Sequence, residues 1–203
     1  PGELGGILPS REWKKINKDE PWYRGETLIT GIGQGFMTAS PIQLALATGA
    51  IANKGNLLTP RVLMHSQSKD GQSYNESQPQ SRRIPIKNID NWELIIQAMK
   101  QTIYGKLGTA KRLNNKLRYT LAGKTGTAQV FGLDPEEEYI AENIDEKLRD
   151  HALFTAFAPI ENPQVAIAII VENAGSGSSK AAPLARTLLD DYFNKYSVDP
   201  DKI

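Results

Sequence analysis

The sequence contains no cysteine, and only two of its 203 residues are histidine, His65 and His151. A chain without cysteine cannot form disulfides, use a thiolate as a nucleophile or build a cysteine-based zinc site. Neither histidine lies in an HExxH pattern, and no serine lies in the GxSxG turn of the α/β-hydrolases. Thiol chemistry is therefore excluded, zinc-hydrolase and α/β-hydrolase chemistry lack support, and we expect no metal and no cofactor.

An excess of either charge is also missing. The chain carries 24 basic and 23 acidic side chains, a net charge of +1, whereas proteins that neutralise phosphates present a clustered basic surface. We therefore expect no nucleic-acid partner. The longest apolar run, residues 165–171, is far shorter than the ~20 residues that cross a bilayer, so any membrane anchor of the protein is expected outside this chain.

What the sequence does contain is typical of a globular domain. Apolar residues make up 39% of the chain and charged residues 23%, and at ~150 residues per domain this length predicts a single domain. Residues 1–30 mix glycine, proline, aromatic and charged residues without a sustained period. We predict an irregular arm over this stretch.

Capping signals predict two helices in the first half. Ser40 and Gln43 form a capping box in front of an apolar stripe, which predicts a helix over residues 41–53. Asp90, as N-cap with Glu93 three residues later, is predicted to begin a second amphipathic helix that ends at Gly105. The polar segment between the two helices, residues 65–81, contains the turn signal Lys69-Asp70-Gly71 and is predicted to be a solvated hairpin.

The second half changes to strand-like patterns. Residues 120–130, 152–158 and 164–172 are predicted strands, and the turn-forming link between the last two indicates an antiparallel hairpin. An acidic connector, residues 134–150, is typical of a solvated face. The Gly175–Ser179 segment is expected to be a flexible loop in front of a final helix.

That final helix is predicted to cover the sheet with one apolar face. The face consists of Leu184, Leu188, Leu189, Tyr192 and Tyr196. The sequence therefore predicts an α+β fold in which residues 120–196 form an antiparallel sheet and the C-terminal helix, with helices covering the sheet.

Two phosphate-binding motifs are incomplete. A P-loop ending at Lys124-Thr125 requires glycine at position 118, which is arginine. The Gly31-Ile-Gly-Gln-Gly35 cluster has Phe36 where the dinucleotide fingerprint requires glycine. We interpret this cluster as an irregular approach to the helix at 41–53.

The segment Lys124-Thr125-Gly126-Thr127 has the chemistry of a carboxylate-binding strand. A lysine raises the positive potential of a cleft, and two threonine hydroxyls can hydrogen-bond a substrate carboxylate. Gly126 leaves room for a peptide to lie against the strand. A peptide added as a further strand would be held by main-chain hydrogen bonds.

Several segments carry a resemblance to a known family. They are Ser10-Arg-Glu-Trp13 with Pro21-Trp22-Tyr23, Leu121-Ala-Gly-Lys-Thr-Gly-Thr-Ala-Gln-Val-Phe-Gly-Leu133, Leu148-Arg-Asp-His-Ala-Leu-Phe-Thr-Ala-Phe-Ala-Pro159 and Gln164-Val-Ala-Ile-Ala-Ile-Ile-Val-Glu-Asn173. They resemble the penicillin-binding protein 2 family, class B peptidoglycan D,D-transpeptidases of the cell-elongation machinery in Gram-negative rods. The resemblance implies that residues 1–203 are the C-terminal part of a transpeptidase domain, a partial β-lactamase/transpeptidase-like fold that lacks its N-terminal portion.

The same resemblance implies the roles of the site residues. Lys124 and Thr127 would be catalytic, and Thr125, Gly126 and Thr127 would bind substrate, with the backbone N–H of Thr127 forming half of the oxyanion hole. The implied ligands are peptidoglycan stem peptides and β-lactams. The implied partners are a membrane glycosyltransferase and a rod-shape scaffold protein, at the periplasmic face of the bacterial inner membrane.

The nucleophile of the family is not expected in this chain. Ser66-Gln-Ser-Lys69 and Ser73-Tyr-Asn75 match its S-x-x-K and S-x-N motifs. However, the nucleophile must begin a packed helix that desolvates its lysine, and these serines lie beside an Asp-Gly turn. We therefore predict that the chain alone is inactive. The strands that would pair with residues 164–172 are also expected outside this chain. The uncovered edge therefore predicts dimerisation, strand exchange or poor solubility of the isolated chain.

Two alternatives remain open at this point. A non-catalytic peptide-binding or scaffold module of the same fold would keep the sheet and helices without needing the Lys124–Thr127 run. The triplet Arg149-Asp150-His151 is typical either of an ion pair at the start of a strand or of a proton relay. We favour the enzyme fragment for the chain, the ion pair for the triplet and a structural hydrogen bond for His151.

Overall fold

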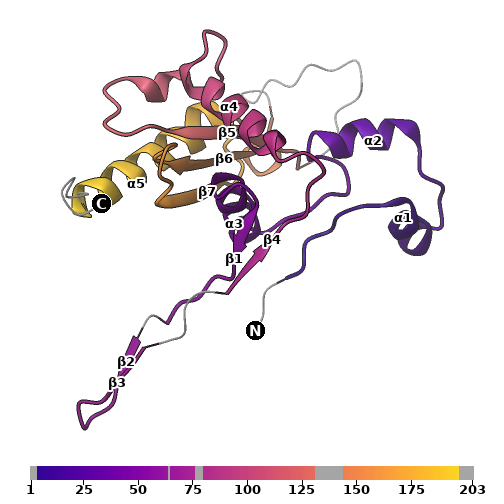
Figure 1. Ribbon diagram of the computed structural model, residues 1–203. Helices are drawn as coiled ribbons and strands as arrows, with labels where there is room; N and C mark the ends of the chain where they lie inside the picture. Colours follow the sequence, from indigo (N-terminus) through magenta and orange to yellow (C-terminus); the bar gives the residue numbers. More distant parts are fainter. Residues whose placement is uncertain (1–3, 64, 76–79, 131–143, 197–203) are drawn as a thin grey trace. The chain divides into compact units, whose positions relative to one another are not determined.

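The computed structural model describes residues 4–63, 65–75, 80–130 and 144–196 (Figure 1). Its α-helices are α1 (Arg11–Lys18), α2 (Arg24–Gly31), α3 (Pro41–Ala52), α4 (Asp90–Tyr104) and α5 (Ala182–Lys195). Its strands are β1 (Asn56–Leu58), β2 (His65–Gln67), β3 (Ser73–Asn75), β4 (Ser81–Arg83), β5 (Ala122–Ala128), β6 (His151–Ala158) and β7 (Val165–Val171). Short helical turns are η1 (Lys111–Asn114), η3 (Glu146–Leu148) and η4 (Gly177–Ala181). The mixture of helices with an antiparallel sheet confirms the predicted α+β class.

The chain divides into two compact units. The first contains Pro1–Leu44, Lys124–Thr155 and Ala168–Ile203, and the second contains Ala45–Gly123 and Ala156–Ile167. The boundaries fall within β5, β6 and β7, so each of these strands contributes residues to both units. The Lys124–Thr127 segment belongs to the first unit.

The main sheet has the strand order β5-β6-β7, and Figure 1 shows the three strands side by side. Six residues link β6 to β7, too few for the crossover that parallel strands need, and the backbone N–H of Gln164 donates to the carbonyl of Ala158 at 3.0 Å. The predicted antiparallel hairpin is therefore confirmed. Within the described residues β5 and β7 are the edges of this sheet, and dimerisation through such an edge stays a prediction.

The second unit has a core of apolar residues from helices and strands. Ala52 of α3, Ile96 and Met99 of α4, Ala122 of β5 and Phe157 of β6 form one buried cluster. Both predicted helices thus supply a buried face, as amphipathic helices in globular domains do.

The N-terminal cap is as predicted at α3 and differs from the prediction at α4. The Ser40 N–H donates to Gln43 Oε1 at 2.9 Å, and the Gln43 N–H donates to Ser40 Oγ at 3.3 Å, which is the predicted capping box. At α4 the side chain that accepts is Asn88, which bonds the Asp90 N–H at 3.0 Å. Asp90 is therefore the first helical residue and not the cap.

The prediction of an irregular arm over residues 1–30 is wrong, because α1 and α2 lie within it. Ser10 Oγ caps α1 by accepting from the Trp13 N–H at 3.0 Å. The two helices are joined by Lys14, which is only 1% exposed and lies 2.5 Å from Glu26 and 3.3 Å from Glu20. Sequence reasoning missed these helices because a buried ion pair, and not an apolar stripe, holds them.

The Lys14–Glu26 pair gives the first unit a testable response to acid. The hydrogen bond from Lys14 holds the pKa of Glu26 below its ordinary value. A pKa that is lower in the folded state stabilises the fold at neutral pH, and this stabilisation is lost as the pH falls through the folded-state pKa. We expect limited proteolysis of residues 11–31 to stay constant from neutral pH down to the ordinary glutamate pKa of 4.5 and to increase as the pH falls below it.

Glu26→Gln should abolish most of this acid-dependent increase by making α1 and α2 accessible already at neutral pH. Glu20→Gln is the matched control, since it removes the more exposed partner of Lys14 and keeps the shorter contact to Glu26. Equal proteolysis profiles for the two variants would contradict the assignment.

The expected apolar face of the last helix is also wrong in part. The buried residues of α5 include Ala182, Ala185 and Leu189, whereas Leu184 and Leu188 are about half exposed. Small alanines allow the helix backbone to pack closely, and this buried face cannot be found by searching for large apolar residues.

The loop expected at residues 175–179 is helical in part. Residues from Gly177 onward form the π-helical turn η4, which leads into α5.

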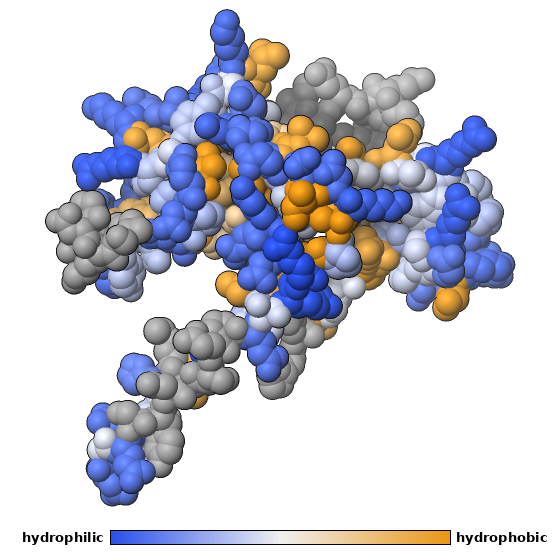
Figure 2. Space-filling view, viewed as in Figure 1, coloured by the Kyte–Doolittle hydropathy of each residue, from blue (hydrophilic) through white to orange (hydrophobic). Residues whose placement is uncertain are grey.

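The polar segment after α3 forms a hairpin as predicted. Strand β2 pairs antiparallel with β3, and Gly71 has a φ of +80° in the turn. Figure 2 shows hydrophilic residues over the described part of this hairpin.

Ser66 lies in β2 and is exposed. An exposed strand does not provide the desolvated environment that a catalytic lysine beside the serine requires. Most of the predicted acidic connector lies outside the described residues.

Candidate active-site strand

The Lys124–Thr127 segment lies on β5, as the sequence predicts. Lys124 and Thr127 are exposed, whereas Thr125 and Gly126 are half-buried. The Lys124 ammonium donates to the backbone carbonyl of Thr125 at 2.6 Å, so the charge lies close to the strand. The segment therefore presents a cation and a hydroxyl to solvent on one strand.

The position of β5 in the sheet suits the binding of an extended peptide. Within the described residues β5 pairs with β6 on one side and with no strand on the other. An edge strand offers alternate N–H and C=O groups to an added strand. A ligand with a carboxylate end can thus combine main-chain pairing with the charge of Lys124.

The backbone around Gly126 is packed tightly. A Cβ at Gly126 would lie 3.2 Å from Leu153 Cβ of the neighbouring strand. A Cβ at Gly177 would lie 2.3 Å from the Leu153 carbonyl oxygen and 2.5 Å from the Gly126 carbonyl oxygen. The sequence predicted that Gly126 leaves room for a substrate peptide. It did not indicate a packing role for Gly177, because the Gly-Ser-Gly-Ser pattern is typical of loops.

Hydrogen bonds fix the strand ends beside this segment. The Asn173 N–H donates to His151 Nδ1 at 2.9 Å, and the Val130 N–H donates to the carboxylate of Asp150 at 3.4 Å. The Asp150 carbonyl accepts from the Gly175 N–H at 2.8 Å. The prediction that His151 is a structural hydrogen-bonder is confirmed, and Asp150 links the end of β5 to the start of β6.

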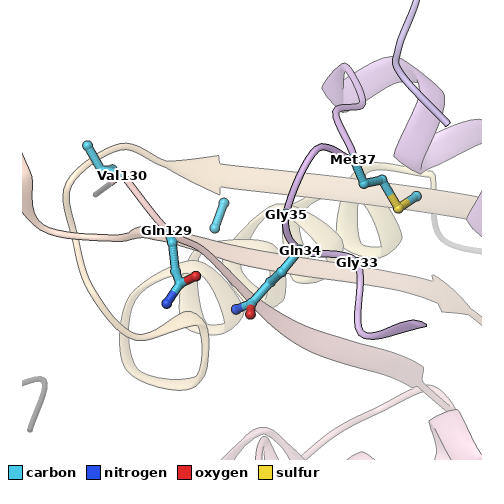
Figure 3. A pocket seen from close by; sticks show the side chains of 7 residues that line it. Gly33, Gln34, Gly35, Met37, Gln129 and Val130 are labelled. Atoms are coloured by element: carbon cyan, nitrogen blue, oxygen red, sulfur yellow. The ribbon is translucent and has the colours of Figure 1, made fainter. Parts of the chain in front are cut away.

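A pocket of about 270 Å³ lies just beyond the C-terminal end of β5 (Figure 3). The described residues that line it are Gly33, Gln34, Gly35, Met37, Ala128, Gln129 and Val130. Gly33 and Gly35 have φ angles of +78° and +74°, which glycine adopts without a side-chain clash. The glycine cluster that fails the dinucleotide fingerprint therefore forms one wall of a pocket, a role that sequence reasoning did not assign to it.

Two further findings apply to the described residues alone. No group of three or more histidine or carboxylate side chains converges there in a way that could hold a metal ion. None of the helices there has the length and apolar content that a membrane crossing requires.

The chain matches a known domain family over most of its length. The model of the penicillin binding protein transpeptidase domain matches residues 1–190. Among curated proteins, the peptidoglycan D,D-transpeptidase MrdA of Haemophilus influenzae is 39% identical over 193 residues, which cover 95% of this chain and 30% of that protein. The MrdA of Escherichia coli K12 is 43% identical over 188 residues, 93% of this chain and 29% of that protein. The chain thus spans about a third of the length of these relatives.

Solved structures give the same relationship. The structure of Pseudomonas aeruginosa PBP2 in complex with WCK 5153 has a TM-score of 0.75 and 42% identity, and it covers 95% of this chain and 39% of that chain. The complex between PBP2 and MreC of Helicobacter pylori has a TM-score of 0.77 and 32% identity, and it covers 97% of this chain and 32% of that chain. The similarity to PBP2 structures confirms the resemblance drawn from the sequence.

Proposed function

The chain belongs to the penicillin-binding protein transpeptidase domain family, and from this premise we propose that it forms one wall of the active site of a serine-type peptidoglycan D,D-transpeptidase. The observation that carries the proposal is the exposed cation and hydroxyl of Lys124 and Thr127 on β5, which is an edge strand of its sheet within the described residues. A carboxylate-ended peptide can pair with this edge and place its terminal charge beside the ammonium group.

The proposed reaction uses a serine nucleophile. The serine oxygen attacks the carbonyl carbon of the penultimate D-Ala, the C–N bond to the terminal D-Ala breaks, and the serine proton passes to the leaving nitrogen, so that D-Ala leaves as a free amine. An amine of a neighbouring stem peptide then attacks the acyl-serine ester, forms the new amide and returns the proton to the serine. A β-lactam is attacked in the same way, but its ring opens without releasing a fragment.

Each residue of the Lys124–Thr127 segment has a role in this proposal. Lys124 supplies positive potential for the substrate carboxylate, and Thr125 and Thr127 supply hydroxyl groups that hydrogen-bond it. The backbone N–H of Thr127 donates to the oxyanion that develops during attack. Gly126 keeps the strand surface open for the substrate.

We place the nucleophile outside these 203 residues. Ser66 lies on an exposed hairpin strand, not at the start of a packed helix, and the curated relatives are about three times longer than the chain. The isolated chain is therefore proposed to be inactive. By the same relationship we propose a location at the periplasmic face of the inner membrane.

The proposed partners follow from the relatives. The Helicobacter pylori PBP2 structure is a complex with MreC, which supports a rod-shape scaffold as a partner of this protein. A membrane glycosyltransferase is proposed from the family alone.

Labelling with a fluorescent penicillin tests the proposed function. We expect the full-length protein to become labelled at one serine outside residues 1–203 and the isolated chain to remain unlabelled. Mass spectrometry of the labelled peptide identifies the serine. Labelling of Ser66 or Ser176 would contradict the placement of the nucleophile, and an unreactive full-length protein would favour the non-catalytic alternative.

A further inference from the structure

The loop between α2 and α3, residues 32–40, borders the C-terminal end of β5. Its residues 33–35 and 37 line one pocket together with residues 128–130 at the strand end, and in Figure 3 the loop passes beside that end. All of these residues belong to the first unit. Because Thr127 directly precedes the strand end, the position of the loop sets the width of the space beside the proposed active-site segment.

Backbone hydrogen bonds hold both ends of this loop. Near its start, the Gln34 N–H donates to the carbonyl of Ile29 in α2 at 3.1 Å. Near its end, the Ile7 N–H donates to the Thr38 carbonyl at 2.9 Å, and the Thr38 N–H donates to the Ile7 carbonyl at 3.1 Å. All of these donors and acceptors are main-chain atoms, so a change of side chain in the middle of the loop leaves them in place.

The middle of the loop is held by a side chain, Phe36. Its half-buried ring lies against α1, where the ring centroids of Phe36 and Trp13 are 5.4 Å apart with an interplanar angle of 47°. The ammonium groups of Lys14 and Lys18 lie 6.0 Å and 5.7 Å from the centre of the Phe36 ring, which is the range of cation–π attraction. Three side chains of α1 therefore hold the ring.

Helix α1 is itself fixed against α2 through Lys14. The Lys14 side chain is buried, and its ammonium group lies 2.5 Å from a carboxylate oxygen of Glu26 and 4.2 Å from the centre of the Tyr23 ring. Removing one partner of a buried ion pair is strongly destabilising, so α1 cannot easily move away from α2. Helix α1 therefore gives Phe36 a rigid support.

We infer that Phe36 is a positioning residue of the proposed active site: α1 holds its ring, and the ring fixes the loop at residues 32–40 beside the end of β5. This inference rests on the proposed function. Phe36 acts through the loop and not through contact with the substrate. The inference also gives α1 a role in the reaction, which is to support this loop.

Acylation of the full-length protein by fluorescent penicillin measures the effect of Phe36. Phe36→Leu removes the ring and keeps an apolar side chain. We expect the second-order acylation rate constant to fall about tenfold, less than the ~10²-fold that a misplacement of ~1 Å can cost. Phe36→Tyr keeps the ring and should react at a rate close to that of the wild type. A Phe36→Leu protein that reacts at the wild-type rate would overturn the inference.

A double-mutant cycle tests whether Phe36 acts through α1. Trp13→Leu removes the other ring of the pair and should slow acylation to the same extent as Phe36→Leu. If the two rings act as one unit, the protein with both substitutions should be no slower than either single variant. Effects that multiply in the double variant would overturn the assignment of α1 as the support.

Tyr196→Leu is the matched control for the loss of an aromatic pair. Tyr196 follows α5 in the same unit, its ring centroid lies 5.0 Å from that of Tyr192 with an interplanar angle of 42°, and Lys195 lies 5.7 Å from its ring. We expect this variant to acylate like the wild type. A loss equal to that of Phe36→Leu would show that the position of Phe36 is not the cause.

Hydrogen exchange measures the loop independently of activity. Peptides that cover residues 32–40 should exchange faster in Phe36→Leu than in the wild type, and at the wild-type rate in Tyr196→Leu. Equal exchange in all three proteins would overturn the inference even if acylation falls. If Phe36→Leu does not fold, Trp13→Leu, which leaves the loop sequence intact, is compared in its place.

The two measurements also separate this inference from the proposed function. If penicillin does not acylate the wild-type full-length protein, the proposed function fails. The exchange rates then still decide whether Phe36 holds the loop. If the wild type is acylated and Phe36→Leu matches it in both rate and exchange, the proposed function stands and the positioning role is wrong.

Discussion

Replacing Lys124 by alanine in the full-length protein is expected to slow acylation by penicillin by about 10²–10³-fold, the cost of removing one electrostatic group from a reaction centre. Lys124 is exposed on β5, so its loss removes positive charge from the strand without opening a cavity. The second-order acylation rate constant, measured from the time course of fluorescent labelling, gives this effect directly.

Stability separates this effect from misfolding. Surface substitutions typically change the free energy of unfolding by less than ~0.5 kcal/mol, so the thermal unfolding midpoint of the Lys124→Ala protein should stay close to that of the wild type. Lys106→Ala removes an exposed lysine of the second unit and should leave both acylation and stability unchanged. A similar loss of acylation in the two variants would show that total charge matters and not the position of Lys124.

Local signals in the sequence predicted most of the elements that surround this strand. The capping box at Ser40 and Gln43 is observed with both of its hydrogen bonds, and the turn at Gly71 joins the predicted hairpin. These features depend on residues that lie a few positions apart, so their chemistry is visible in the chain itself.

The features that sequence reasoning missed depend on residues distant in the chain. Lys14 and Glu26 hold α1 and α2 together across twelve positions, and no hydrophobic period marks such a pair. The pocket brings Gln34 next to Gln129, although the two are far apart in the sequence. Gly177 likewise faces the backbone of Gly126 and Leu153, and its own neighbours predict only a loop.

The close approach at Gly177 leads to the second large expected effect. A methyl group at this position would lie 2.3 Å and 2.5 Å from two carbonyl oxygens of β6 and β5. Both obstacles are backbone atoms and cannot rotate away as a side chain would. We expect Gly177→Ala in the full-length protein to lower the free energy of unfolding by about 1–3 kcal/mol, the usual cost of overpacking.

The same substitution should also reduce acylation, because relief of the clash requires η4 or β5 to move and Gly126 lies within the Lys124–Thr127 segment. Gly25→Ala in α2 is the matched control, since a Cβ there meets no atom within 4 Å. In a helix, alanine is favoured over glycine by roughly 0.5–1 kcal/mol, so this variant should unfold at the same or a higher temperature. The two glycine-to-alanine changes therefore have opposite expected signs. If the Gly177→Ala protein is as stable and as reactive as the wild type, residue 177 of η4 does not lie in close contact with the backbone of β5 in the full-length protein.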